Sequence, residues 1–286
     1  MKLMEVTSTQ SMEEKRIQRV TDAAGVSIEI QIPAPGSGES VFAISPHKCG
    51  STMLAGILQH IARHADKPFL SLTGQLFQQG YPIMKAPAEV FDIWRKPGYT
   101  FAGIRSPNPL FETDAFRRDA RKILLVRDPR DVATSLYFSQ AKSHGAPGRG
   151  ALTASFEKTR ANAQSVDINR YVLDGKANPV LNSLQRLSGL LGSQKLHVFR
   201  YEDIIFNKQE WIEEIGHVFR VSIPDALMSD LLDRYDVLPS SEDPSRHVRQ
   251  VKPGNFEKHL SPEAIQYIQN RFSKVFEAFR YPLLTP

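Results

Sequence analysis

The sequence contains very little of what several protein classes depend on. Its single cysteine, Cys49, excludes a disulfide scaffold and any zinc or iron–sulfur site built from several cysteines. No run of about 18 apolar residues occurs, and residues 1–14 lack an apolar stretch, so we expect neither a transmembrane segment nor a signal peptide. The 8 histidines show no ligand spacing, so we predict no metal site. Together these absences predict a cytoplasmic protein.

The chain also carries only a small excess of positive charge. The chain has 36 Lys and Arg against 31 Asp and Glu, a net charge of +5, and 41% hydrophobic residues. This composition is typical of a globular protein; its basic excess suits anionic ligands but is too small for a nucleic-acid-binding surface. Nothing in it indicates the oligomeric state. Two basic clusters are either two solvated faces or two walls of one anion site: Arg117, Arg118, Arg121, Lys122, Arg127 and Arg130, and Arg246, His247, Arg249 and Lys252.

Hydrophobic patterning predicts strands that alternate with helices. Val41–Ile44 is a short apolar run, as in a buried parallel strand, and a helical apolar stripe follows it to about His64. The unit recurs with a strand over Lys122–Val126 and a helix that begins at Pro129. Further predicted elements are a strand over 196–199 and helices over 180–191, 209–219 and 262–279. The fold class is therefore α/β, with a mostly parallel sheet covered by helices on both faces.

We predict a single domain over residues 39–286. Residues 1–38 are polar and end in a stretch rich in Pro and Gly, which predicts an N-terminal extension whose order the sequence leaves open. The connections over 66–100 and 140–175 show no regular pattern. Long irregular connections in a compact domain are often functional, so we expect 67–99 and 140–161 to contact a substrate.

The first predicted strand and helix are joined by Ser45–Thr52, which has the features of an anion-binding loop. It leads to a helix N-terminus, where unpaired N–H groups and the helix dipole favour phosphate, and Gly50 lets the backbone approach the anion. Lys48 stands before Gly50, whereas a Walker A loop places its lysine directly after its second glycine. This order argues against an ATP-dependent kinase. A helix start with an incidental lysine is the plainer alternative.

Three further stretches carry motifs: Val126–Ser135, Phe199–Ile204 and Arg249–Phe256. Together with His47–Met53, they resemble, in the same order, the motifs of sulfotransferases that use 3′-phosphoadenosine 5′-phosphosulfate (PAPS). His47–Met53 is similar to the family's 5′-phosphosulfate loop, which implies a P-loop-like fold. Val126–Ser135 is similar to its 3′-phosphate motif, where an Arg and a Ser eight residues later hold the 3′-phosphate. Phe199–Ile204 resembles the family's Tyr-Glu-Asp strand end, which lies beside the adenine. Arg249–Phe256 resembles the family's C-terminal nucleotide-binding segment.

The resemblance implies a nucleotide site that binds PAPS and releases adenosine 3′,5′-bisphosphate (PAP). The residues implied are Lys48, Cys49, Gly50, Ser51, Thr52, Met53, Arg127, Ser135, Tyr201, Arg249, Gln250 and Val251. Lys48 is placed to neutralise charge on the leaving oxygen. Structural alternatives exist: Arg127 as an ion-pair partner of Asp128 or Asp131, Tyr201 as a packing residue with a bonded hydroxyl, and Cys49 as a small space-filling residue.

The acceptor side departs from the family pattern. Where small-molecule sulfotransferases of the cytosol have a histidine base, this chain has Arg105, which stays protonated and suits sulfuryl oxygens or an anionic acceptor. Candidate bases are His47, beside Lys48, and Glu112. The resemblance implies transfer of a sulfuryl group to a hydroxyl or amine of a glycan, glycolipid or small polar metabolite. The alternatives are a nucleotide or small-molecule kinase and a non-catalytic protein that binds a nucleotide or glycan.

Overall fold

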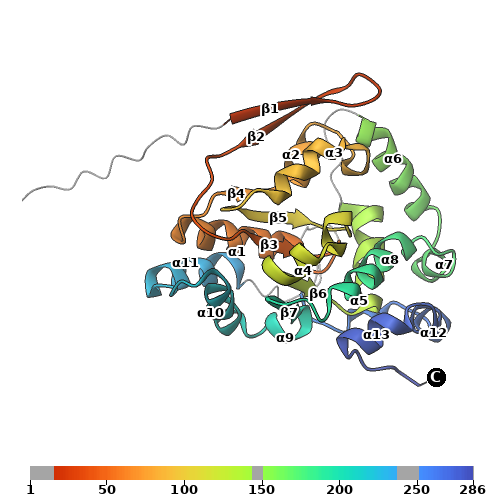
Figure 1. Ribbon diagram of the computed structural model, residues 1–286. Coiled ribbons are helices and arrows are strands. Elements are labelled where there is room, and N and C mark those ends of the chain that lie inside the picture. The colour runs from red at the N-terminus through yellow and green to blue at the C-terminus, as the bar shows by residue number, and fades with distance from the viewer. Residues whose placement is uncertain (1–15, 144–150, 237–250, 286) are drawn as a thin grey trace, which may run out of the picture.

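A parallel β-sheet lies at the centre of the molecule. The structure is a computed structural model, and it describes residues 16–143, 151–236 and 251–285. The sheet has five strands in the order β4-β5-β3-β6-β7, and every adjacent pair is parallel (Figure 1). The predicted parallel sheet is confirmed. Its strands are β3 (Val41–Ile44), β4 (Phe69–Leu70), β5 (Thr100–Ile104), β6 (Arg121–Val126) and β7 (Leu196–Arg200).

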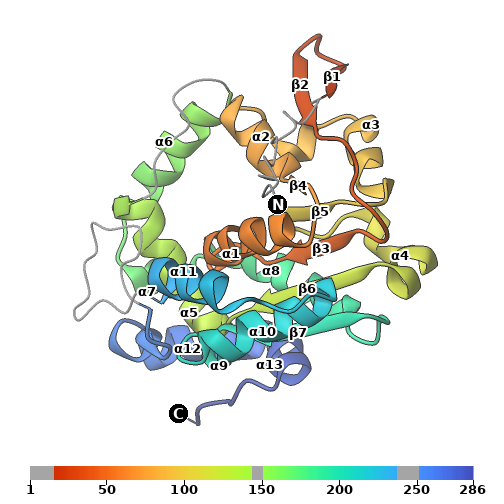
Figure 2. The same ribbon diagram turned by 90° about the vertical axis from the view of Figure 1, so that its left-hand side faces the viewer.

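One face of the sheet packs on the helix that follows β3 and on two later helices. Successive strand side chains point to opposite faces, so Ala43, Ile123 and Leu125 share one apolar cluster with these helices. In Figure 2 the three helices lie in front of the sheet. They are α1 (Ser51–His64), α10 (Lys208–Phe219) and α11 (Asp225–Tyr235).

The opposite face carries the larger apolar cluster. Phe42, Leu124 and Val126, which alternate with the residues of the first face, pack there against a second layer of helices. The predicted arrangement with helices on both faces is thereby confirmed. This layer includes α5 (Pro129–Phe138), α8 (Asn178–Leu187), α12 (Pro262–Arg271) and α13 (Ser273–Phe279).

Two predictions about helices are wrong. The single helix expected over 262–279 is broken at Phe272, whose φ of −116° lies outside the helical region, so α12 and α13 both turn apolar residues into one core. The stretches expected to be irregular contain helices: α2 (Leu72–Gln78), η1 (Ile83–Lys85), α3 (Ala88–Phe91), η2 (Asp92–Arg95), α6 (Ala151–Gln164) and α7 (Ile168–Leu173). Most are too short to show a helical period. No helix in the described ranges is long and apolar enough to cross a membrane.

The second half of the predicted N-terminal extension forms an antiparallel hairpin of β1 (Arg16–Thr21) and β2 (Ser27–Ile32). Alternate residues of β2 are buried in the larger cluster: Ile28, Ile30 and Ile32. The side-chain amide of Gln79, the C-cap of α2, both accepts from the backbone N–H of Glu29, at 3.0 Å, and donates to its carbonyl, at 2.7 Å. These contacts attach the hairpin to α2 (Figure 1).

Candidate active site

The anion-binding loop leaves the carboxyl end of β3 and enters α1. Two of its residues have left-handed backbone conformations, Lys48 with φ 70° and Gly50 with φ 90°. No side chain caps the N-terminus of α1, which leaves the N–H groups of its first turn directed at the loop. A Cβ atom on Gly50 would lie 3.1 Å from the ring of Tyr201 and 3.3 Å from Leu125. The loop therefore needs glycine here for its backbone conformation and for its close approach to Tyr201.

Arg127 follows β6 at the same edge of the sheet and is only 6% exposed. Its guanidinium stacks 4.3 Å from the ring of Tyr201 and makes two long contacts, from Nη1 to the Lys48 carbonyl at 3.4 Å and from Nη2 to Asp131 at 3.5 Å. Its buried Nε has no hydrogen-bond partner among the described residues. Burial alone would lower the pKa of Arg127, but nearby acidic groups, first Asp131, raise it overall. The result is a charged fork beside the loop with capacity to bind an anion.

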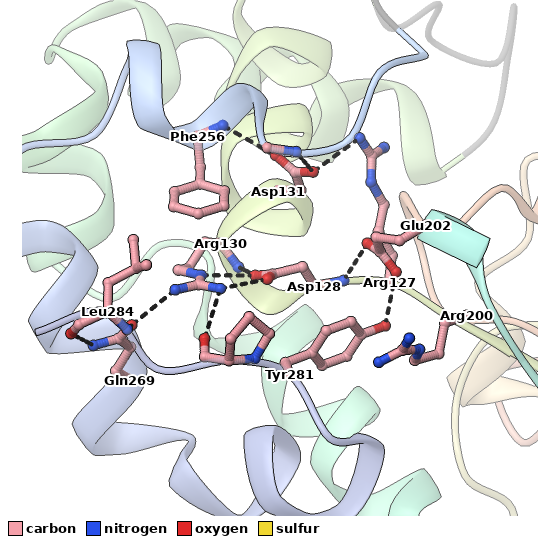
Figure 3. Close-up of polar contacts among 12 residues, drawn as sticks. Arg127, Asp128, Arg130, Asp131, Arg200, Glu202, Phe256, Gln269, Tyr281 and Leu284 are labelled. Carbon is pink, nitrogen blue, oxygen red and sulfur yellow. Dashed lines mark hydrogen bonds and ion pairs between the residues drawn. The ribbon is translucent and has the colours of Figure 1, made fainter. Parts of the chain in front are cut away.

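Asp131 connects Arg127 to the C-terminal motif. Its carboxylate accepts hydrogen bonds from the backbone N–H of Gly254, at 2.9 Å, and of Phe256, at 3.0 Å (Figure 3). The hydroxyl of Tyr201 donates to the Val251 carbonyl at 3.1 Å. All four motifs thus meet around Arg127, which also contacts the Lys48 carbonyl of the first. The nucleotide contacts predicted for Arg249 and Gln250 lie outside the described residues.

The acidic residue of the Tyr-Glu-Asp stretch holds the start of α5 in place. The carboxylate of Glu202 accepts from the backbone N–H of Asp128 at 2.9 Å and from the hydroxyl of Tyr281 at 3.1 Å (Figure 3). Burial raises the pKa of Glu202. Sequence reasoning assigned no role to Glu202 or Tyr281, and weighed Asp131 only as an ion-pair partner. The sequence did contain a signal for Glu202, because this residue is the glutamate of the Tyr-Glu-Asp motif.

The first basic cluster is divided between the core and the site. Arg130 is 1% exposed, and its guanidinium binds Asp128, Gln269 and the Pro282 carbonyl, while Phe256 lies 4.3 Å away (Figure 3). Arg121 and Lys122 are buried too, at the amino end of β6. This cluster is therefore not a single solvated face. Of these side chains, Arg127 is the one that contacts the loop and its Lys48 carbonyl.

The remaining nucleotide-binding candidates lie on α1 and α5. Ser51, Thr52 and Met53 form the first turn of α1, and Ser135 is half-buried on α5, roughly two turns after Arg127. Cys49 is fully buried, and burial strongly raises the pKa of its thiol. A neutral buried thiol is a small packing group and not a nucleophile.

His47 lies between two cavities. The smaller, of about 220 Å³, is lined by His47 and Lys48 together with residues of α5 and α6. The larger, of about 450 Å³, is lined by His47, Arg105 and many residues of the 83–95 segment. Glu112 is exposed on η3 (Pro109–Glu112) and lines neither cavity, so the geometry favours His47 as the proton acceptor. No group of three potential metal ligands occurs in the described ranges.

Comparisons with solved structures found sulfotransferases of low sequence identity to this chain. Mouse sulfotransferase SULT7A1 complexed with PAP is 14% identical with a TM-score of 0.50, over 87% of this chain and 86% of that chain. The sulfotransferase from Alicyclobacillus acidocaldarius is 12% identical (TM-score 0.43, 85% of this chain, 95% of that chain). The sulfotransferase domain of the Synechococcus PCC 7002 olefin synthase is 17% identical (TM-score 0.41, 89% and 99%). No curated protein matches this chain.

The family model described as "Sulfotransferase domain" matches residues 39–280. This range contains the whole parallel sheet and all four motif stretches, and it leaves out the N-terminal hairpin. The predicted family is therefore confirmed: the chain belongs to the sulfotransferase domain family.

Proposed function

We propose that this protein transfers a sulfuryl group from PAPS to a hydroxyl or amine of an acceptor, and that it does so in the cytoplasm. The observation that carries the proposal is the buried Arg127 guanidinium, whose Nε has no partner among the described residues, beside a glycine loop at an uncapped helix N-terminus. A nucleotide with both 5′ and 3′ acidic groups needs two such anion sites at one sheet edge. PAPS would supply the activated sulfuryl group.

The chain's own residues divide between binding and charge stabilisation. Arg127 and Ser135 bind the 3′-phosphate, and the N–H groups from Gly50 to Met53 hold the 5′ group. Arg249, Gln250 and Val251 complete the nucleotide site from the C-terminal segment, which Asp131 holds against α5. The ammonium of Lys48 stabilises negative charge as it grows on the leaving oxygen. His47 takes the proton of the acceptor.

The size of the acceptor cavity, about 450 Å³, suits a small molecule better than a polymer. Several residues of the 83–95 segment line this cavity. Glycans and glycolipids, which the sequence left open, are the less favoured acceptors.

The test is a thermal-shift comparison of PAP, ADP and ATP with magnesium. Binding to the native state raises the melting temperature, and at equal concentrations the tighter ligand raises it more, so PAP should give a clear shift and ADP a small one. A shift by ATP with magnesium that exceeds the shift by PAP would support a kinase instead. Tight PAP binding without sulfation of any hydroxyl or amine in a broad acceptor panel would support the non-catalytic alternative.

A further inference from the structure

Arg105 is a half-buried cation without an acidic partner among the described residues. It follows β5 at the carboxyl end, and its Nε is buried and has no hydrogen-bond partner among the described residues. It forms no ion pair with any carboxylate in the described part of the chain, and burial lowers the pKa of its guanidinium. Burying a charge is costly unless an opposite charge or hydrogen-bond acceptors compensate it. The site is therefore built to receive an anion.

The cavity beside Arg105 is otherwise largely apolar and aromatic. Its apolar wall includes Ile83, Met84, Phe91, Trp94, Ile104 and Leu110. The other two charged side chains that line it, Asp92 and Arg95, bind each other at 3.2 Å. A ligand that fills this cavity therefore meets one unpaired positive charge on an apolar background.

The position of Arg105 places its positive charge where the acceptor would bind and not where the donor would bind. Lys48, which stabilises the leaving oxygen in the proposed function, lines the smaller cavity and not the larger one. Arg105 lines the larger cavity and not the smaller. His47 lines both, so it lies between Lys48 on the donor side and Arg105 on the acceptor side.

The contact between Arg105 and His47 places the proposed anion site beside the proposed proton acceptor. Nη1 of Arg105 lies 3.4 Å from Nδ1 of His47. A guanidinium has only donors, so Nδ1 carries a lone pair in this arrangement. A carboxylate matches the fork of an arginine and would replace this contact, after which Nδ1 can accept a proton from a hydroxyl close to that carboxylate.

We infer that the acceptor is an apolar hydroxy acid, in which the carboxylate binds Arg105 and the adjacent hydroxyl is sulfated. The inference rests on the proposed function. As the acceptor oxygen forms its bond to sulfur, its proton passes to Nδ1 of His47. The bond from sulfur to the bridging phosphate oxygen breaks, and its electron pair stays on that oxygen beside Lys48. The products are the sulfate ester and PAP.

The experiment compares acids with their methyl esters: mandelate, 3-phenyllactate and 3-hydroxydecanoate. Dissociation constants are measured by calorimetry with and without saturating PAP, and sulfation is measured with PAPS. At least one acid should bind roughly tenfold or more tightly than its ester, because a charged hydrogen bond is lost in the ester. In Arg105→Gln this ratio should fall to about one. Lys85→Gln, at an exposed position of η1 that does not line the cavity, is the control and should keep the ratio.

Each opposing result has a distinct meaning. If every ester binds as tightly as its acid, or if no acid binds, the inference is wrong. If Arg105→Gln reduces the turnover of an acid and its ester equally, Arg105 acts on the sulfuryl group and the inference is also wrong. His47→Asn should keep the binding of the acids and lose most of their turnover. Absence of PAP binding would refute the proposed function, while the comparison of acids and esters without PAP still tests the anion site.

Discussion

The carboxylate of Asp131, in the first turn of α5, accepts a hydrogen bond from the backbone N–H of Gly254 at 2.9 Å. The same carboxylate lies 3.5 Å from Arg127. A single buried acid thus contacts both the arginine that we propose binds the 3′-phosphate and the C-terminal segment. Because Asp131 is 1% exposed, neither contact can be replaced by water without rearrangement.

Replacing Asp131 with alanine should lower both stability and nucleotide affinity. The buried N–H of Phe256 and the partly buried N–H of Gly254 would lose their acceptor, and a fully buried unsatisfied group costs about 1–3 kcal/mol of unfolding free energy. The affinity for PAP should fall as well, because the C-terminal segment is no longer held. Urea unfolding and calorimetry measure the two effects, and Asp233→Ala, at an exposed position of α11, is the control. Normal PAP affinity in a folded Asp131→Ala protein would contradict this role.

Arg127→Ala should discriminate between nucleotides. Loss of hydrogen bonds to a charged group should weaken PAP binding by roughly 1.5–3 kcal/mol, while 5′-AMP, which has no 3′-phosphate, should be affected little. The comparison is made by calorimetry, with Arg118→Ala, an exposed residue of α4 (Asp114–Asp119), as the control. Equal losses for the two nucleotides would show that Arg127 does not bind the 3′-phosphate.

Lys48→Met should slow sulfuryl transfer more than it weakens nucleotide binding. Negative charge grows on the bridging oxygen only as the bond to sulfur breaks, so an ammonium beside it stabilises mainly the transition state. We expect turnover to fall about a hundredfold or more and the PAP dissociation constant to change much less. Lys274→Met, an exposed position on α13, should have normal turnover. Near-normal turnover with a raised Michaelis constant for PAPS in Lys48→Met is the result that excludes this role.

Gly50→Ala should impair both the loop and the contact with Tyr201. The added methyl group would lie 3.1 Å from the Tyr201 ring, on a backbone with φ 90° that L-residues rarely adopt. The backbone conformation alone costs roughly 1–2 kcal/mol. We expect a lower melting temperature and weaker PAP binding. Gly189→Ala, where a methyl group meets nothing within 4 Å, should change neither, and a Gly50→Ala protein with unchanged PAP affinity would rule out close approach of the loop to the anion.

The buried side chain of Lys122 should make the stability of the folded protein depend on pH. Its buried Nζ donates to the carbonyl oxygens of Phe116, Arg117 and Ala120, and burial lowers its pKa from 10.5 to about 8. Between these values the unfolded chain binds more protons than the folded one, so stability should rise with pH. Relative to Lys122→Met, the unfolding free energy of the wild type should rise by about 1–2 kcal/mol from pH ~7 to pH ~9.5. A difference that is constant or falls over this range, in urea unfolding, would be inconsistent with a lowered pKa.

Local sequence was sufficient for the elements that touch the nucleotide site. The four-residue apolar run of β3 predicts a buried strand, and Asp128-Pro129 predicts a helix start, because the Asp side chain caps the helix and the Pro ring presets φ. The motifs on these elements then place Lys48 and Arg127 at adjoining strand ends. These features depend on neighbours in the chain, so the sequence alone predicts them.

Contacts between distant segments required the tertiary structure. The anchoring of the C-terminal segment by Asp131 joins residues 125 positions apart at most, and the contact between His47 and Arg105 spans 58. The hairpin and the short helices around the acceptor cavity were also missed, because elements of three to seven residues are fixed by packing and not by their own periodicity.

The sequence by itself determined the family, the parallel sheet and the nucleotide-binding loop. Only the tertiary structure decided which charges are neutralised in the core and that Arg105 lacks an acidic partner in the described residues, because pairing depends on how the chain brings distant side chains together.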